Sequence, residues 1–150
     1  MDLILKISEK CNFKCTFCSS TSIAEDKNDT VPLDRVFQFL TRYPDTRTII
    51  VNGGDPLVIQ PQYYWDLIKY LDDHNLPASI SFTSNLWPFF VKPDRWVDLF
   101  RNERVGVATS FQYGNARLKH DLTPYTEEEF WKVSDLMLEI LYLSAMFKGE

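Results

Sequence analysis

The chain lacks several features that mark whole classes of protein. With 150 residues and a formal net charge of −5, it lacks the basic excess typical of proteins that bind nucleic acid. No apolar run approaches the roughly 20 residues of a membrane-spanning helix, and residues 1–6 do not form a signal peptide. No internal repeat or low-complexity tract is present. We therefore expect one cytoplasmic globular domain over residues 1–150, with no membrane or nucleic-acid partner.

Cysteine is also scarce, and the three cysteines lie close together. Cys11, Cys15 and Cys18 all fall in the run CNFKCTFC. A structural zinc site normally needs four protein ligands, but there is no fourth cysteine and the two histidines are distant in sequence. A disulfide framework needs an even number of cysteines and a secretory context. Three thiolates in one short loop can bind three corners of a four-iron cluster and leave the fourth iron open. Zinc binding and chance clustering of buried cysteines remain the alternatives.

The rest of the chain alternates between strand-like and helix-like patterns. Apolar or β-branched runs predict strands over residues 3–8, 48–51, 79–83 and 105–109. Four helices are expected, the first and third beginning at Pro32 and Pro93, the second ending near Asn75, and the last capped by Thr126 with Glu129. Their apolar faces are Leu33, Val36, Phe37 and Leu40; Tyr64, Leu67, Ile68 and Leu71; Trp96, Leu99 and Phe100; and Phe130, Val133, Met137, Ile140 and Leu141. This alternation predicts an α/β fold of four parallel βα units with right-handed crossovers.

A cluster of polar or glycine residues follows each predicted strand. The first strand leads into the cysteines, and the others into Asn52-Gly53-Gly54-Asp55-Pro56, Thr83-Ser84-Asn85 and Thr109-Ser110. Functional groups of parallel α/β sheets lie beyond the C-terminal ends of the strands. We therefore predict that these clusters meet at one edge of the sheet.

Taken together, the cysteine run with its aromatic Phe17, the loop Gly53-Gly54-Asp55-Pro56 and the repeated βα pattern resemble the radical S-adenosylmethionine (radical SAM) superfamily. The glycine loop resembles the GGE motif of that superfamily, with Asp in place of Glu. The resemblance implies a partial (β/α) barrel of parallel strands with outer helices. It also implies a [4Fe–4S] cluster on the three cysteines and reductive cleavage of S-adenosylmethionine, giving a 5′-deoxyadenosyl radical that abstracts hydrogen from a substrate.

The same resemblance assigns roles to further residues. Phe17 would pack near the adenine, while an ordinary core position is the alternative. Arg117 and Lys119 could neutralise the ligand carboxylate or could belong to a solvated loop. The other expected contacts are those of the glycine loop (Gly53, Gly54, Asp55, Pro56) with the methionine amino group and those of Ser84, Asn85 and Ser110 with its carboxylate and the ribose. Ordinary turn roles are the alternative at these positions.

The chain departs from the superfamily in its number of βα units. The usual core has six units, which need about 180–190 residues, whereas four are expected here. We therefore expect over 1–150 a core domain that is a truncated or fragmentary member, a minimal member, or one completed by a partner. The open sheet edge after the fourth strand also makes a homo-oligomer an expected arrangement. The expected partners are an electron donor such as flavodoxin or ferredoxin and an unknown substrate, a small molecule or a peptide. The alternative function is a non-catalytic or partner-dependent iron–sulfur or metal-binding fragment of such an enzyme.

Overall fold

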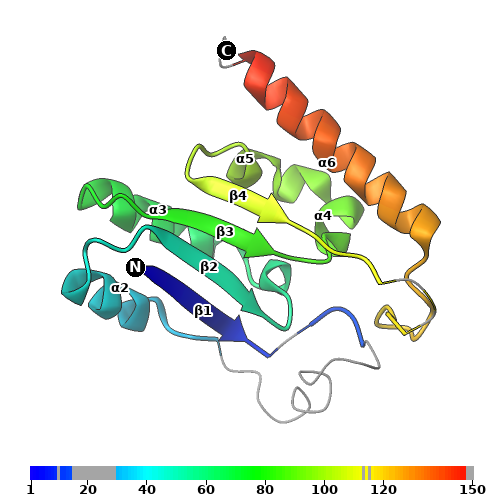
Figure 1. Ribbon diagram of the computed structural model, residues 1–150, viewed down its shortest axis with the longest axis horizontal. Helices are drawn as coiled ribbons and strands as arrows, with labels where there is room; N and C mark the ends of the chain where they lie inside the picture. Colours follow the sequence, from blue (N-terminus) through cyan, green and yellow to red (C-terminus); the bar gives the residue numbers. More distant parts are fainter. Residues whose placement is uncertain (10, 15–29, 113, 115, 148–150) are drawn as a thin grey trace.

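The computed structural model describes residues 1–9, 11–14, 30–112, 114 and 116–147, with residues 141–147 described as helical backbone only. Its centre is a four-stranded sheet in the order β1-β2-β3-β4, with every neighbouring pair parallel (Figure 1). The strands are Asp2–Ser8, Thr48–Gly53, Ser79–Thr83 and Val105–Ala108. The predicted order, direction and approximate bounds of the four strands are confirmed.

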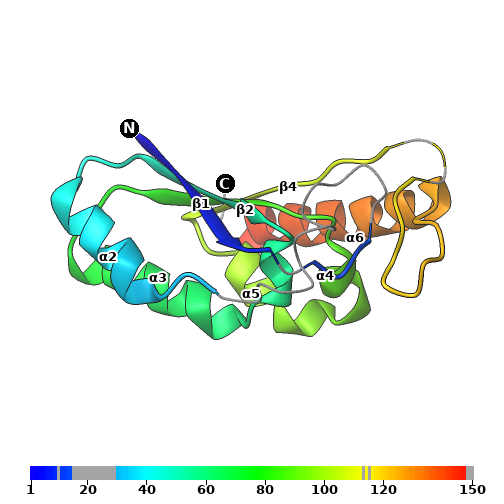
Figure 2. The ribbon, with the colours of Figure 1, turned by 90° about the horizontal axis from the view of Figure 1, so that it is seen from below.

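The helices connect these strands and cover one face of the sheet (Figure 2). Helix α2 follows β1, a 3₁₀ turn η1 and α3 follow β2, and α6 follows β4. Between β3 and β4 lie α4, the 3₁₀ turn η2 and α5. The bounds of these elements are Leu33–Arg42 for α2, Pro56–Val58 for η1, Pro61–Asp73 for α3, Trp87–Val91 for α4, Pro93–Arg95 for η2, Val97–Phe100 for α5 and Glu127–Phe147 for α6. The four-stranded parallel sheet with its layer of helices is a partial (β/α) barrel.

The connection between β3 and β4 differs from the prediction. The helix expected from Pro93 is divided into η2 and α5, although its predicted apolar residues Trp96, Leu99 and Phe100 are all buried. Helix α4 was not predicted, because its sequence, Trp-Pro-Phe-Phe-Val, shows no helical periodicity over so short a length. Pro88 lies in its first turn, where a missing backbone N–H costs no hydrogen bond.

The core lies between the sheet and the helices. Alternate strand residues, such as Ile49, Val51, Ile80 and Phe82, are buried on the face that the helices cover. The predicted helix faces supply the other half of this core, with Val36, Leu40, Tyr64, Leu67, Ile68, Leu71, Val133, Met137 and Ile140 all buried. Leu141 belongs to the residues whose side chains are outside the description.

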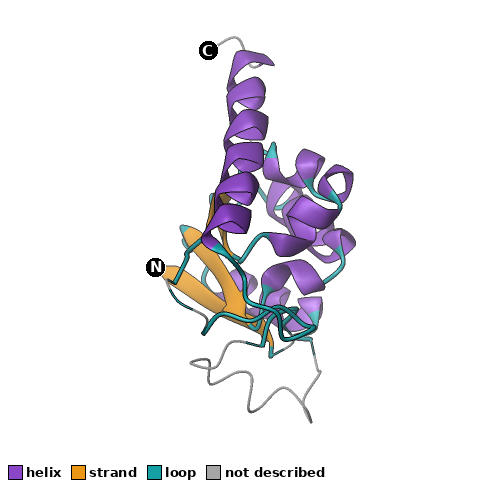
Figure 3. Ribbon diagram, turned by 90° about the vertical axis from the view of Figure 1, so that its right-hand side faces the viewer, coloured by secondary structure: helices purple, strands orange, loops and turns teal. Residues whose placement is uncertain are grey.

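The opposite face of the sheet is open among the described residues (Figure 3). Ile4 on β1 is 65% exposed, and Thr83, Gly106 and Ala108 are exposed on β3 and β4. Most of these side chains are small, so this face leaves room above the sheet. Among the described residues, no helix is both long enough and apolar enough to cross a membrane.

Two helix ends have the predicted caps. The Thr126 backbone N–H donates to Glu129 Oε1 at 3.0 Å, and the Glu129 N–H donates to Thr126 Oγ1 at 3.2 Å. This reciprocal arrangement is a capping box at the start of α6. At the end of α3, Asn75 has a φ of +52° and its N–H donates to the Asp72 carbonyl, while the Leu76 N–H donates to the Leu71 carbonyl. These two bonds form a Schellman motif.

Candidate functional site

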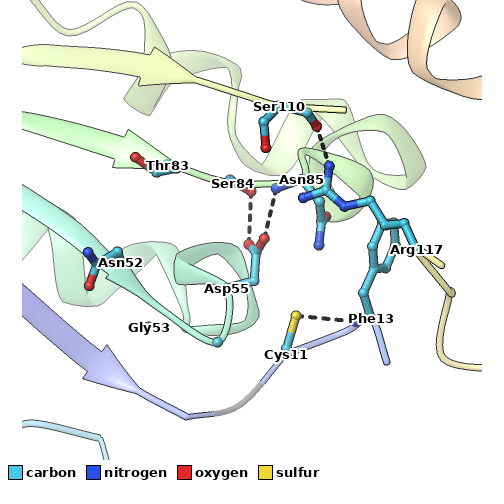
Figure 4. Close-up of a pocket in the computed structure, with 11 residues that line it drawn as sticks. Cys11, Phe13, Asn52, Gly53, Asp55, Thr83, Ser84, Asn85, Ser110 and Arg117 are labelled. Carbon is cyan, nitrogen blue, oxygen red and sulfur yellow. Dashed lines mark hydrogen bonds between the residues drawn. The ribbon is translucent and has the colours of Figure 1, made fainter. Parts of the chain in front are cut away.

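The C-terminal ends of all four strands border one cavity of about 160 Å³ (Figure 4). The predicted meeting of the strand ends is therefore confirmed. The residues that line the cavity are Cys11 and Phe13 after β1; Asn52, Gly53, Gly54 and Asp55 at the end of β2; Thr83, Ser84 and Asn85 at the end of β3; and Ser110 and Arg117 after β4. Pro56 is not among them, because it begins η1, is buried, and its carbonyl accepts a hydrogen bond from the Tyr64 hydroxyl.

The glycine turn after β2 brings the ends of β1 and β2 together. Gly53 has a φ of +127°, and a Cβ there would lie 2.3 Å from the Ser8 carbonyl oxygen. The Gly54 N–H donates to the same oxygen at 2.8 Å. A side chain at position 53 would therefore collide with backbone, which explains why glycine is needed there.

The Asp55 carboxylate joins the end of β2 to the end of β3. It is 3% exposed. Its Oδ1 accepts the Leu57 N–H at 3.0 Å and the Ser84 hydroxyl at 2.8 Å, and its Oδ2 accepts the Asn85 N–H at 2.9 Å. Burial raises the pKa of Asp55 above its usual value, although these three hydrogen bonds and the positive charge of Arg117 act to lower it.

Asp55 thus has a structural role beside its predicted contact with the cofactor. The likeness of the glycine loop to the GGE motif predicts that Asp55 contacts the methionine amino group. Both carboxylate oxygens also accept hydrogen bonds from this chain's own groups, and Asp55 still lines the cavity. Ser84 is likewise buried, and its oxygen also accepts the Leu86 N–H at 2.9 Å. These contacts hold the shape of the cavity wall.

Cys11 lies in the cavity, on a segment anchored to the chain after β4. Its Sγ accepts a hydrogen bond from the Phe13 N–H at 3.3 Å. The Phe13 ring is 3% exposed and packs on Tyr125 with a centroid distance of 5.0 Å. The Lys14 N–H donates to the Leu118 carbonyl at 2.7 Å. The other predicted residues of the cysteine run, Cys15, Phe17 and Cys18, lie outside the described residues, so the three-cysteine ligand set stays a prediction.

Of the two basic residues considered as carboxylate partners, only Arg117 lines the cavity. Its guanidinium donates to the Ser110 carbonyl and lies 6.0 Å from the centre of the Phe13 ring. Lys119 instead pairs with Glu129 at 2.7 Å and lies over the Trp87 ring. The sequence does not show which of these two residues lines the cavity, because their segment is placed by contacts with Phe13, which is about 100 residues away in the chain.

The side chains that line the cavity could bind an amino acid next to a metal that is held by a thiolate. A cysteine Sγ is a soft metal ligand, and the Arg117 guanidinium is the cation among the described lining residues. Guanidinium groups bind carboxylates with charge-assisted hydrogen bonds. Amide and hydroxyl groups of Asn52, Thr83 and Ser110 add hydrogen-bonding capacity on the open side. The residues present therefore fit a cofactor that carries an amino-acid group and polar hydroxyls.

Comparison with known proteins gives a family match and distant relatives. A family model described as the Radical SAM superfamily matches residues 5–144. L-lysine 2,3-aminomutase of Fusobacterium nucleatum subsp. nucleatum is 25% identical over 72 residues, which are 46% of this chain and 17% of that protein. GTP 3′,8-cyclase of Helicobacter pylori is 33% identical over 58 residues, which are 36% of this chain and 18% of that protein. The chain thus matches less than a fifth of the length of these curated relatives.

Solved structures show the same fold. Native anSMEcpe with bound AdoMet and Cp18Cys peptide superimposes with a TM-score of 0.72 at 17% sequence identity, covering 92% of this chain and 39% of that chain. Native anSMEcpe with bound AdoMet gives a TM-score of 0.73 at 17% identity, covering 92% of this chain and 40% of that chain. The likeness extends over nearly all of the present chain and less than half of the other.

We expect replacement of Asp55 by alanine to destabilise the fold by about 2–5 kcal/mol, because three donors lose their buried acceptor. Urea unfolding followed by circular dichroism measures this loss. The matched control is Asp66→Ala on the exposed side of α3, with an expected change within about 0.5 kcal/mol.

The pH dependence of this loss follows from the pKa of Asp55. Because the folded-state pKa lies above the usual 3.8, the folded protein binds the proton more tightly than the unfolded chain. The stability that this group contributes is present below pH 3.8 and falls as the pH rises through the folded-state pKa. The deficit of the Asp55→Ala variant should therefore be larger at acidic than at alkaline pH. A deficit equal to that of the control, or one that grows with pH, would contradict this reading of Asp55.

Proposed function

The chain belongs to the radical SAM superfamily, and from this premise we propose that it binds a [4Fe–4S] cluster through Cys11, Cys15 and Cys18 and S-adenosylmethionine in the strand-end cavity. The bound cofactors supply one-electron cleavage of the sulfonium to methionine and a 5′-deoxyadenosyl radical, which abstracts hydrogen from a substrate. The observation that carries the proposal is the position of Cys11 and Arg117 in one cavity at the C-terminal ends of the strands.

Each side of the cavity has a task in this proposal. Arg117 binds the methionine carboxylate, and the Gly53-Gly54 turn lets backbone approach the amino group. Ser110 contributes its hydroxyl toward the carboxylate and ribose. Ser84 and Asn85 line the same cavity, where their side chains already bond within the chain, so each offers the ligand one further donor or acceptor. Phe13 and Tyr125 pack together beside Cys11 and exclude water from that side of the cavity. Asp55 acts through its neighbours, since its oxygens are occupied by the chain's own donors.

The partners of this reaction are also part of the proposal. An electron donor such as flavodoxin or ferredoxin supplies the electron in the cytoplasm, where reduced thiols persist. The substrate, a small molecule or a peptide, approaches the open face of the sheet, where small side chains leave room. A second copy of the chain or another protein binds beside β4, an edge strand of the described sheet. The alternative is a non-catalytic or partner-dependent protein of this superfamily that binds an iron–sulfur cluster or another metal through the same cysteines.

Reconstitution with iron and sulfide under anaerobic conditions should yield about four irons per chain, as expected for one such cluster. Reduction with dithionite in the presence of S-adenosylmethionine should then give 5′-deoxyadenosine, measured by liquid chromatography. Cys11→Ala should abolish this product, because the cluster loses a ligand. The control is Ser79→Ala at the opposite end of β3, which should retain it. A cluster without cleavage would favour the alternative, and an unaffected Cys11→Ala variant would refute the ligand assignment.

Arg117→Ala should weaken binding of S-adenosylmethionine about 10- to 100-fold, because one charge-assisted hydrogen bond is lost. Isothermal titration to the reconstituted protein measures the Kd. Lys119→Ala removes a positive charge two residues away, from a side chain that pairs with Glu129, and should leave the Kd within about twofold. Equal losses in both variants would mean that only the net charge of the segment matters.

A further inference from the structure

Two asparagine side chains join the cysteine-containing segment to the end of β3. Asn85 Nδ2 donates to Asn12 Oδ1 at 2.9 Å, and Asn12 Nδ2 donates to Asn85 Oδ1 at 3.3 Å. The two residues are 73 positions apart in sequence. The bonds are reciprocal, so this Asn12–Asn85 amide pair fixes both the distance and the relative orientation of the two segments.

The orientation of the amide pair follows from a third contact. The Trp87 N–H, at the start of α4, donates to Asn85 Oδ1 at 3.0 Å. Asn85 Oδ1 is thereby identified as the acceptor, and Asn85 Nδ2 must face an acceptor of its own. Asn12 Oδ1 is that acceptor. The same oxygen lies 3.9 Å from Cys11 Sγ, within reach of a hydrogen bond from the thiol.

Asn85 is itself held rigidly at the end of β3. Its backbone N–H donates to Asp55 Oδ2 at 2.9 Å, and it is 4% exposed. The next residue, Leu86, has a φ of +61° and is 1% exposed, a backbone conformation that a leucine adopts only when its surroundings impose it. The Ser84 hydroxyl, which binds Asp55, also accepts the Leu86 N–H. A firmly anchored strand end thus carries the amide that contacts the cysteine segment.

Two contacts anchor residues 12–14, the described part of the cysteine segment after Cys11. Phe13 and Lys14 contact the segment of residues 117–119 through ring packing and a backbone bond. The amide pair ties Asn12, the residue directly after Cys11, to β3. Two anchors on different elements set the position of Cys11 more sharply than one anchor does.

We propose that the Asn12–Asn85 amide pair is a positioning contact that holds Cys11 at the strand-end cavity before any metal binds. The importance of that position for cluster assembly rests on the proposed function. The positioning itself is a property of the chain without metal. Because folding already orders Cys11, the free energy of metal binding does not include the entropy cost of ordering this residue. Asn12 and Asn85 act through Cys11, so they are positioning residues in this respect.

The test uses the full chain without metal, with Cys15 and Cys18 replaced by serine so that Cys11 is the single thiol. Its readout is the rate of Cys11 alkylation by iodoacetamide at fixed pH under native conditions, followed by mass spectrometry. Loss of the pair should raise this rate about 5- to 10-fold in Asn12→Ala and in Asn85→Ala, as expected for hydrogen bonds of ordinary net strength. The double variant should show no further increase, because both changes remove the same contact.

Two further variants separate positioning from general destabilisation. Asn85→Ser keeps an oxygen near the Trp87 N–H but is too short to reach Asn12. It should therefore match Asn85→Ala while preserving the hydrogen bond to the first residue of α4. It also serves if Asn85→Ala fails to fold. Asn52→Ala is the matched control, since it removes an amide from the same cavity outside the pair. It should leave the alkylation rate unchanged.

The results distinguish the amide pair from the proposed function. Unchanged rates in the single variants, or effects that multiply in the double variant, would overturn the positioning role. If the single variants raise the alkylation rate with no further rise in the double variant, in a protein that assembles no four-iron cluster, that result would leave the positioning role intact and refute the proposed function. A four-iron cluster in the unmodified chain, together with unchanged or multiplying alkylation rates in the variants, would support the proposed function and overturn the positioning role.

Discussion

The buried carboxylate of Asp55 is the interaction on which the arrangement of the cavity depends. The hydrogen bonds that join neighbouring strands stop at the strand ends. They therefore do not hold together the segments that follow the strands. Here one side chain after β2 accepts hydrogen bonds from two residues after β3 and so continues the link between the strands past the sheet. Burying a carboxylate is costly, and three donors offset part of that cost here.

The same link extends from the sheet to the cysteine segment. Asp55 holds the backbone of Asn85, the Asn85 amide holds Asn12, and Asn12 is the direct neighbour of Cys11. The apolar core under the sheet sets the spacing of the strands, whereas this polar chain of contacts sets where the functional groups lie beyond them. A rigid scaffold of strands and helices thus positions residues that belong to connecting segments.

The elements with a clear local pattern could be predicted from the sequence. The strands, the apolar faces of α2, α3 and α6, and the capping box at Thr126 follow from periodicity and from contacts three or four residues apart. The hydrogen bonds of Asp55 to the end of β3 and the distinction between Arg117 and Lys119 could not be predicted. Both depend on partners about 30 to 100 residues away, such as Ser84 for Asp55 and Phe13 for Arg117.

Electron paramagnetic resonance of the reduced, reconstituted protein, with and without S-adenosylmethionine, tests most directly whether the cavity binds this cofactor beside a cluster. A ligand that occupies the open iron of a cluster changes its electronic environment. We expect a four-iron signal whose g-values shift when S-adenosylmethionine is added. A four-iron signal that stays the same at saturating S-adenosylmethionine would contradict it.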